Sequence, residues 1–362
     1  MRIALVHEFL TQLGGAERVL ENFLEIWPNA MVHVLIYDEK KTHGKFEQYQ
    51  KRLSFLNNWP LARTHYKLLL PFMTQAIESF KFDDFDLVIS DSSAFAKGIK
   101  TDKLHICYCH TPTRYLWTEA KSYLKAMPYP FFLKWAGSSV LPYLRRWDYK
   151  AAQRVNFFVA NSENVRKRIG KYYQRDSVVI PPPVDNEFFR PVSEKKDYFF
   201  TASRLEPYKK MEIVVGAFNV SGLKLKIAGT GSKLAALKKL AKSNIEFLGR
   251  ISDDELRRRY SEAQAFIFPA EEDAGIMILE ANACGTPVIA YRAGGALESV
   301  IEGKTGEFFK EQSVEAIKTV VRNFDAKKYN AETIRQQAQQ YDKKIFQKKI
   351  KEFVEEKYAH RT

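Results

Sequence analysis

Cysteine is scarce in this sequence, and its scarcity excludes several classes of protein. Only Cys107, Cys109 and Cys284 occur among the 362 residues. Three cysteines are too few, and odd in number, for a framework of disulfide bonds, and such scarcity is typical of a reducing compartment. Cys107 and Cys109 share the apolar run LHICYC, where a strand would place both thiols on one side. Because no His/Cys cluster elsewhere offers the other half of a zinc site, we expect packed thiols and no metal ligands.

Long apolar runs are also missing. No run approaches the roughly 18 residues that a membrane-spanning helix needs. The start, MRIALVHEFL, reaches His7 and Glu8 too early for a signal peptide. The apolar fraction of 45% and the charged fraction of 28% are those of a soluble globular protein. We therefore expect a cytoplasmic protein.

Positive charge is in excess, but no segment concentrates it. The net charge is +14, of which residues 1–190 carry +8 and the remainder +6. Such a balance suits nucleic acid, an anionic membrane surface or a phosphorylated ligand. Because the chain has no basic arm and no recognised nucleic-acid module, we expect no nucleic acid among its partners.

Short apolar runs rich in Val, Ile and Phe recur along the chain with helical stretches between them. Such runs are typical of strands buried on both faces of a parallel sheet, and their alternation with helices indicates βαβ units. The runs are IALV, VHVLI, DLVIS, LHICYC, FFVA and VVI, followed by YFFTAS, LKIAG, IEFLG, AFIFP and VIAY.

The length of the chain and a proline-rich stretch at its middle predict two domains. Three consecutive prolines in VVIPPPVDNEFFRPVS exclude both a helix and an interior strand. We predict an α/β fold of two doubly wound, Rossmann-like domains that face each other across a cleft. Their expected bounds are 1–183 for the first domain, 184–196 for a linker, 197–343 for the second domain and 344–362 for a terminal helix.

The terminal helix has an apolar face. Its expected inward residues are Ile345, Ile350, Phe353 and Val354. The helix either crosses back to the first domain or packs on the second.

Ligands of doubly wound sheets bind beyond the carboxyl ends of the strands, so the residues that follow strands are informative. Gly14 and Gly15 form a turn after the first strand and precede a helix that begins near Ala16. Glycines at a helix start let backbone amides approach an anion. His110 follows LHICYC, where its imidazole either binds a sugar oxygen or caps its own loop.

Two cations flank a strand-to-helix loop in the second half. Arg204 leaves the strand YFFTAS, and Lys209 precedes a helix. Paired cations there suit a diphosphate, although solvated loop charges are the ordinary alternative. Gly229 and Gly231 form the next turn, which is either structural or ligand-facing.

The stretch EEDAGIMILEANACGTPVIAY contains two acids eight positions apart, Glu272 and Glu280. We predict a loop at EEDAG and a helix over IMILEANA, which Gly285 and Pro287 terminate. Glu272 then lies on the loop and Glu280 within the helix.

A carboxylate accepts hydrogen bonds from two neighbouring hydroxyls, and the amides of Gly275, Ile276 and Met277 at the helix start suit an anion. Two diol sites around a diphosphate describe a nucleotide-sugar. The ordinary alternative is an acidic loop followed by a polar helix face.

Eight stretches of the chain resemble a known family. They are LGGAERVLE, CYCHTPTRYLW, VANSENVRKRI, SRLEPYKKMEIVVGAF, IAGTG, FLGRISDDEL, EEDAGIMILEANACGTPVIAYRAGGALESV and EGKTGEFF. In this order they resemble glycosyltransferase family 4, retaining enzymes of the GT-B fold, and within it the bacterial O-antigen-type mannosyltransferases. The resemblance covers nearly the whole chain.

For the second half, the resemblance implies a role for each matching residue. Glu272 faces the hydroxyls of the transferred sugar, and Glu280 takes the ribose diol. Arg204 and Lys209 neutralise the departing diphosphate. The backbone of residues 275–277 lies beneath the sugar and the phosphates.

Three further sites follow from the same resemblance. Gly249 and Arg250 border the base, Gly14 and Gly15 lie under the phosphates, and His110 lies near the anomeric centre. The implied catalytic residues are thus His110, Arg204, Lys209 and Glu272.

The chain departs from the family pattern at one position. The family often has phenylalanine in E-x-F-G, where this chain has Ala274. The missing ring beneath the sugar leaves the identity of the sugar open.

The resemblance implies transfer of a hexose onto a glycan or lipid-linked glycan in cell-surface polysaccharide synthesis. It implies GDP-mannose as the expected donor, with UDP-sugars as the alternative. It implies neither a cofactor nor a metal. The Asp-x-Asp of DDFD, residues 83–86, precedes a strand and is interpreted as a turn. A nucleotide-sugar epimerase and a non-catalytic sugar-binding protein are the rival functions.

Residues 121–150 mix aromatic rings with lysine and arginine. Such a mixture suits the surface of an anionic membrane, with which the protein would associate peripherally at the inner face. A pair of helices packed on the core is the alternative.

Overall fold

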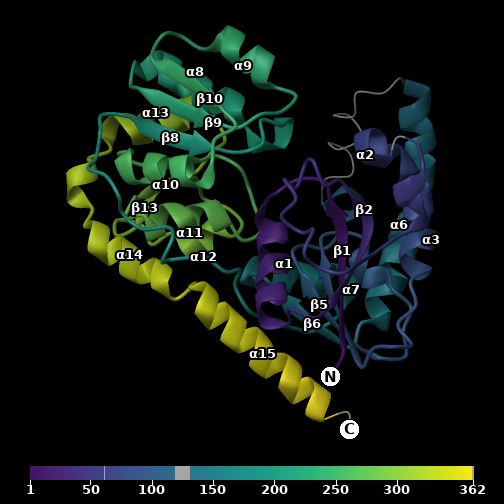
Figure 1. Ribbon diagram of the computed structural model, residues 1–362. Helices are drawn as coiled ribbons and strands as arrows, with labels where there is room; N and C mark the ends of the chain where they lie inside the picture. Colours follow the sequence, from purple (N-terminus) through teal and green to yellow (C-terminus); the bar gives the residue numbers. More distant parts are fainter. Residues whose placement is uncertain (61, 119–130, 361–362) are drawn as a thin grey trace. The chain divides into compact units, whose positions relative to one another are not determined.

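The computed structural model describes residues 1–60, 62–118 and 131–360, apart from the side chains of 67 and 131–139. The described chain forms two compact units. The first unit comprises residues 1–181 and 346–362, and the second comprises residues 182–345 (Figure 1). Each unit contains one parallel sheet with helices on both faces.

The sheet of the first unit has the strand order β3-β2-β1-β4-β5-β6-β7, and all its pairings are parallel. The order reverses between β1 and β4, which is the topological switch point of the sheet. The strands are β1 (Ile3–Leu10), β2 (Met31–Tyr37), β3 (Lys51–Leu53), β4 (Leu87–Ser92), β5 (Leu104–Cys109), β6 (Phe157–Ala160) and β7 (Ser177–Val179).

Two helical layers cover this sheet, because side chains of a strand alternate between its faces. Leu5 of β1 packs in one core with Leu20 of α1 (Gly15–Ile26), whereas Val6 packs in another with Met73 of α3 (Leu70–Glu78). The remaining elements are η1 (Phe55–Asn58), α2 (Ala62–His65), η2 (Tyr66–Leu69), η3 (Ala96–Gly98), α4 (Arg114–Trp117), α6 (Phe131–Arg154) and α7 (Glu163–Tyr173).

Cys107 and Cys109 are both buried in a cluster with residues of α7. Two thiols two positions apart on one strand share a face, so the prediction of packed thiols is confirmed.

The sheet of the second unit has the order β10-β9-β8-β11-β12-β13, also with parallel pairings, and its switch point lies between β8 and β11. The strands are β8 (Phe199–Ala202), β9 (Leu225–Ala228), β10 (Ile245–Gly249), β11 (Phe266–Phe268), β12 (Val288–Tyr291) and β13 (Gly306–Phe309). The helices are η4 (Pro207–Lys209), α8 (Met211–Ser221), α9 (Leu234–Leu240), α10 (Asp253–Glu262), α11 (Ile276–Ala283), α12 (Ala296–Ser299), α13 (Val314–Asn323), η5 (Ala326–Lys328) and α14 (Ala331–Gln339).

Every apolar run predicted as a strand contributes to one of the two sheets, and the α/β fold with two doubly wound sheets is confirmed. Two strands, β3 and β13, were not predicted from the sequence. Both are edge strands with a partly exposed face, so they lack the continuous apolar run of a central strand.

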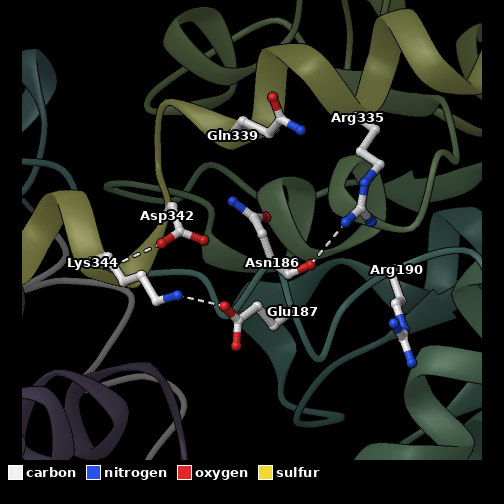
Figure 2. A pocket seen from close by; sticks show the side chains of 7 residues that line it. All are labelled: Asn186, Glu187, Arg190, Arg335, Gln339, Asp342 and Lys344. Carbon is white, nitrogen blue, oxygen red and sulfur yellow. Dashed lines mark hydrogen bonds and ion pairs between the residues drawn. The ribbon is translucent and has the colours of Figure 1, made fainter.

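The stretch 184–196, which the prolines predict as a linker, packs on the second unit. Val184 and Phe189 are buried in its core. The guanidinium of Arg335 in α14 donates to the carbonyls of Asn186 at 3.0 Å and Ala283 at 2.9 Å. Figure 2 shows Arg335 directed at the backbone of Asn186 and Lys344 paired with Glu187. The second unit therefore begins within the run of prolines, at Pro182.

The final helix, α15 (Lys343–Ala359), begins in the second unit and continues in the first. Phe346, Ile350, Phe353 and Val354 are buried in the core that contains α1, a spacing that forms one helix face. The prediction for Ile345 is wrong, because its side chain is 39% exposed and the neighbouring Phe346 is buried instead. Within the described ranges, no helix combines the length and hydropathy needed to cross a bilayer.

Candidate functional site

Polar side chains gather at the switch point of the first unit. His7 of β1 is paired in register with Asp91 of β4, and His110 follows β5 directly. The carboxylate of Asp91 bonds His7 Nδ1 at 2.8 Å through one oxygen and His110 Nε2 at 2.5 Å through the other. All three side chains are buried. We call them the His7–Asp91–His110 cluster.

The electrostatics of this cluster favour its charged form. Burial by itself disfavours an imidazolium, but hydrogen bonds to Asp91 and Glu17 raise the pKa of His7 to about 10. Burial by itself would lower the pKa of His110. The negative charge of Asp91 outweighs this effect, so the pKa of His110 is also raised. Burial by itself would raise the pKa of Asp91. The pKa of Asp91 is nevertheless lowered, because its carboxylate faces both imidazoles. The Asp91 carboxylate therefore favours the cationic form of both rings.

The start of α1 lies beside this cluster. Oε1 of Glu17, in the first turn, is 3.9 Å from His7 Nε2. Gly14 caps the helix with extended backbone and Gly15 is its first residue. A Cβ on Gly14 would lie 3.1 Å from Glu17 Oε2, so glycine leaves room for that carboxylate. The amides of this first turn have no intrahelical acceptor and remain for an anion.

A second carboxylate orders the loop that follows β4. Oε1 of Glu8 accepts bonds from Ser92 Oγ at 3.0 Å and from the amides of Ala94 at 2.7 Å and Ala96 at 3.0 Å. These contacts fix the backbone just after Asp91. Glu8 therefore supports the cluster structurally.

The motif CHTPTRYLW, which contains His110, is anchored by a buried polar network around Asp148 of α6. Lys97 Nζ lies 2.6 Å from its carboxylate. Thr113 Oγ1, Trp117 Nε1 and the hydroxyl of Tyr173 donate to the same carboxylate at 2.8, 2.7 and 2.9 Å. Each buried charge in the network thus has a partner.

At the switch point of the second unit, the loops after β8 and β11 meet. Lys209, the last residue of η4, donates to the carboxylate of Glu272, which belongs to the loop after β11. Two cations lie near the Tyr208 ring, whose centroid is 6.0 Å from the guanidinium carbon of Arg204 and 5.3 Å from Lys209 Nζ. Arg204 is exposed. Three of the predicted side chains are therefore brought together here.

Gly229 and Gly231 support the Arg204 loop. Gly229 has a φ of +128°, and a Cβ there would lie 1.8 Å from the carbonyl oxygen of Ser203. Leu205 N donates to Thr230 O at 2.9 Å. Of the two interpretations, the structural one therefore applies, because only a residue without a side chain permits this approach.

Glycines also support the loop that bears Glu272. Gly295 N donates to the carbonyl of Glu272 at 2.8 Å, and a Cβ on Gly294 would lie 2.3 Å from the same oxygen. A Cβ on Gly295 would lie 2.7 Å from Cα of Ala274. No role was predicted for this glycine pair, although RAGGALESV lies within a stretch that resembles the family.

The helix α11 begins at Ile276 and ends at Ala283, as predicted. Gly275 precedes it with a left-handed φ of +66°. The amides of Ile276 and Met277 in the first turn have no carbonyl of the helix to bond and lie next to Glu272 in the chain. This start can hold an anion beside the Lys209–Glu272 pair.

Glu280 lies deeper than Glu272. Its residue exposure is 2%, and the hydroxyl of Tyr260 in α10 donates to its carboxylate at 3.2 Å. Gly249 ends β10 with a φ of +67°, and its carbonyl accepts from Gly229 N at 2.7 Å. Arg250 follows and is exposed. These residues lie at the same carboxyl edge of the sheet as Arg204 and Glu272.

The Asp-x-Asp of residues 83–86 lies elsewhere. It forms a turn before β4, at the amino edge of the first sheet, where Asp86 accepts from the amide of Arg2 at 2.7 Å and Asp84 lies 3.6 Å from Arg52. In the described part of the chain, no group of three His, Cys, Asp or Glu side chains is arranged to hold a metal. The predicted absence of a metal remains a prediction.

Two family models match the chain. The model described as "Glycosyltransferase Family 4" matches residues 13–188, and the model described as "Glycosyl transferases group 1" matches residues 183–345. Together they span both units.

Curated relatives match at modest identity. A "GDP-mannose-dependent alpha-(1-6)-phosphatidylinositol monomannoside mannosyltransferase" of Mycolicibacterium smegmatis is 29% identical over 51% of this chain and 57% of its own length. A protein of the same description from Mycobacterium tuberculosis is 34% identical over 39% of this chain and 45% of its own length. The chain thus spans about half the length of the curated relatives it matches.

Solved structures match over almost the whole chain. A sucrose-phosphate synthase from Thermosynechococcus elongatus superposes with a TM-score of 0.80 at 14% identity, covering 99% of this chain and 100% of that one. Anabaena HepE in complex with UDP-glucose superposes with a TM-score of 0.74 at 19% identity, covering 98% and 100%. At these identities the likeness shows the fold, which is GT-B.

Proposed function

Since the chain belongs to glycosyltransferase family 4, we propose that it transfers a hexose from a nucleotide-sugar to a hydroxyl of a glycan or lipid-linked glycan acceptor. The observation that carries the proposal is the arrangement at the second switch point. There Arg204, Lys209 and Glu272 converge beside the start of α11. Cations, a carboxylate and open amides are the groups that a diphosphate and a sugar diol need.

In the proposed reaction, the bond between the anomeric carbon and the diphosphate oxygen breaks while the acceptor oxygen bonds the same face of the sugar. The configuration is retained, and the departing phosphate oxygen takes the proton of the acceptor hydroxyl. Arg204, Lys209 and the amides of residues 275–277 stabilise the charge that grows on the diphosphate. Glu272 binds the sugar hydroxyls, and Glu280 binds the ribose.

His110, Gly14 and Gly15 belong to the first unit and complete the proposed set. Because His110 Nε2 is bonded to Asp91, the other ring nitrogen, Nδ1, remains for a sugar oxygen near the anomeric carbon. The raised pKa of His110 favours the imidazolium, in which that nitrogen also donates a hydrogen bond. The open amides at the start of α1 suit the phosphates, and Gly249 and Arg250 border the base.

GDP-mannose is the proposed donor, supported by the two GDP-mannose-dependent relatives. A UDP-sugar is the second candidate, which the likeness to HepE with bound UDP-glucose favours. Ala274 is buried directly beneath the Gly295 turn, where it replaces the larger phenylalanine of the family pattern. A difference at this position bears on the sugar more than on the base.

The proposed enzyme needs neither a cofactor nor a metal, since its own cations neutralise the leaving group. We further propose that it acts in the cytoplasm, peripherally at the inner membrane face, in cell-surface polysaccharide synthesis. The proposed membrane segment, residues 121–150, lies partly outside the described residues. We expect turnover to persist in excess chelator, and this measurement tests the proposed independence of a metal.

The test of the donor is a thermal-shift panel of GDP- and UDP-sugars. A ligand at a hundred times its Kd stabilises the folded state by about 2.7 kcal/mol. We expect GDP-mannose to give the largest shift, and nucleotide release only when acceptor is added. Product formed from the donor alone indicates an epimerase, and a shift with no release in any mixture indicates a sugar-binding protein.

A further inference from the structure

Three aromatic side chains on the first unit are exposed to solvent and contact one another. Phe55, Trp59 and Phe72 expose 41%, 38% and 41% of their surface. The ring centroids of Phe55 and Trp59 are 5.8 Å apart, and those of Trp59 and Phe72 are 5.1 Å apart. We call these three residues the aromatic patch. A contiguous group of exposed rings is typical of an interaction surface.

The backbone beneath the patch is held firmly by the core. Leu56, the residue after Phe55 in η1, is fully buried in the core that contains Val6 and Met73. Ser54 Oγ donates to the carbonyl of Leu35 at 2.8 Å, and Asn57 Oδ1 accepts from the amide of Tyr37 at 2.9 Å. Because these inward contacts fix η1, the outward direction of its aromatic neighbours is a property of the fold.

The chain segment that bears the patch carries charge of one sign. Residues 48–77 contain no Asp or Glu, and they contain Lys51, Arg52, Arg63 and Lys67. Arg63 on α2 is exposed, and its guanidinium pairs with no acid within the described residues. Arg52 has its partner in Asp84, and Lys51 Nζ donates to the carbonyl of Phe46 at 2.6 Å. Arg63 is therefore an exposed cation on α2, a helix that contacts η1.

The patch lies at the functional edge of the first sheet. β3 pairs in parallel with β2 and ends at Leu53, immediately before η1. In a parallel sheet, all strands end at the same edge, so η1 lies at the edge that carries the His7–Asp91–His110 cluster. Figure 1 shows α2 at the end of the first sheet opposite the N-terminus, where β1 begins.

We propose that the aromatic patch and Arg63 dock the first unit on an anionic lipid surface. Aromatic rings insert at the level of the headgroups, and cations beside them meet anionic phosphates. An acid-free segment of thirty residues in a chain of net charge +14 is complementary to that surface. The inference deepens the proposed function and rests on it in one respect, since docking at this edge would bring a lipid-linked acceptor to His110.

The experiment is co-sedimentation of the full chain with vesicles. Wild type is expected to bind phosphatidylglycerol vesicles at low salt and phosphatidylcholine vesicles weakly. Replacing Phe55, Trp59 and Phe72 together by alanine is expected to lower the partition coefficient roughly tenfold or more. Arg63→Ala is expected to lower it about fivefold, an effect that high salt abolishes.

The control is Leu240→Ala in the second unit. Leu240 is 50% exposed and follows Lys238 and Lys239 in α9. Like the aromatic patch, it is an exposed apolar side chain next to cations, but it lies in the other unit. It is expected to bind vesicles as wild type does. Trp59→Phe keeps a ring and is expected to retain binding, and Trp59→Ala alone repeats the test if the triple variant does not fold.

The inference is wrong if wild type does not co-sediment with anionic vesicles, or if the triple variant binds them as wild type does. A wild-type dimer that Trp59→Ala dissociates in gel filtration also overturns it, because a second copy then covers the patch. Nucleotide release with a water-soluble acceptor, measured on the same samples, is expected to be equal in wild type and patch variants. Vesicle binding without any release contradicts the proposed function and leaves this inference standing.

Discussion

At the scale of single residues, each unit has one carboxylate that bonds basic side chains at the switch point of its sheet. Asp91 bridges His7 and His110 in the first unit, and Glu272 holds Lys209 in the second. A carboxylate fixes the position of a cation and favours its charged form. In both units, therefore, a carboxylate holds the basic side chain for which we propose a role in binding the donor.

Lys209→Ala is expected to lower kcat by about two to three orders of magnitude with the fold intact, because one preorganised charge on the leaving group is lost. Steady-state release of nucleotide measures the effect. The neighbouring Lys210 is exposed and is the matched control, so Lys210→Ala should turn over at the wild-type rate. Unchanged kcat in Lys209→Ala would remove the diphosphate role.

Asp91→Asn is expected to change how stability depends on pH. The pKa of His7 is raised from 6.5 to about 10, so its contribution is fully present below pH 6.5 and is lost as pH rises through 10. The pKa of His110 is also raised, so the contribution of His110 to stability is likewise lost as pH rises. Asp91 has a lowered pKa, so its contribution is present above pH 3.8 and is lost in more acidic solution.

The cluster should therefore stabilise the wild-type protein most between about pH 4 and pH 6.5. Between pH 6.5 and pH 10, the free energy of unfolding of wild type should fall by on the order of 3 kcal/mol. Asparagine carries no charge to hold the imidazoliums, so this decline should flatten. Urea unfolding of both proteins across this range measures it. Parallel curves would show that the two histidines are not held charged by Asp91.

At the scale of elements, local turn chemistry decides where the site loops lie. The glycines of IAGTG and RAGGAL let one loop pass against the backbone of another. One pair supports the loop of Arg204, and the other supports the loop of Glu272. The sequence shows these glycines plainly, but whether they face a ligand or a neighbouring loop depends on contacts between different strands.

Gly229→Ala is expected to destabilise the second unit by roughly 3 kcal/mol, because a Cβ meets the Ser203 carbonyl and the positive φ is strained. It should also lower kcat by displacing Arg204. Gly222→Ala is the control: its φ is +75°, but a Cβ there meets nothing within 4 Å. Its expected cost is about 1 kcal/mol with normal kcat. Equal unfolding midpoints for the two variants would contradict the close approach.

At the scale of the whole molecule, the last helix completes a core that the first half of the chain begins. The ring of Phe346 lies 5.9 Å from that of Phe23 in α1 and 5.7 Å from that of Tyr108 in β5. The first unit therefore contains residues from both ends of the chain, and its stability depends on residues more than 300 positions from its start.

Phe346→Ala is expected to cost about 3 to 5 kcal/mol of folding free energy, the usual loss for a buried phenylalanine. The adjacent Ile345 is exposed, so Ile345→Ala should cost less than about 0.5 kcal/mol. Chemical denaturation followed by circular dichroism compares them. Similar losses for the two variants would mean that α15 does not pack through Phe346.

The sequence by itself determined the parts of this protein that depend on neighbours along the chain. Buried strands need apolar runs, so the central strands of both sheets were predictable, and so were the ends of α11, which Gly275 and Gly285 delimit. The spacing of Glu272 and Glu280 likewise follows from a loop that leads into a helix.

Only the tertiary structure decided which of these residues meet. His7 and Asp91 are 84 positions apart, and Lys209 and Glu272 are 63 apart. Each pair is joined because the strand order of its sheet reverses at that point and places the two strands next to each other. A hydrogen bond or an ion pair depends on distances of a few ångströms, and the order of strands in a sheet sets those distances.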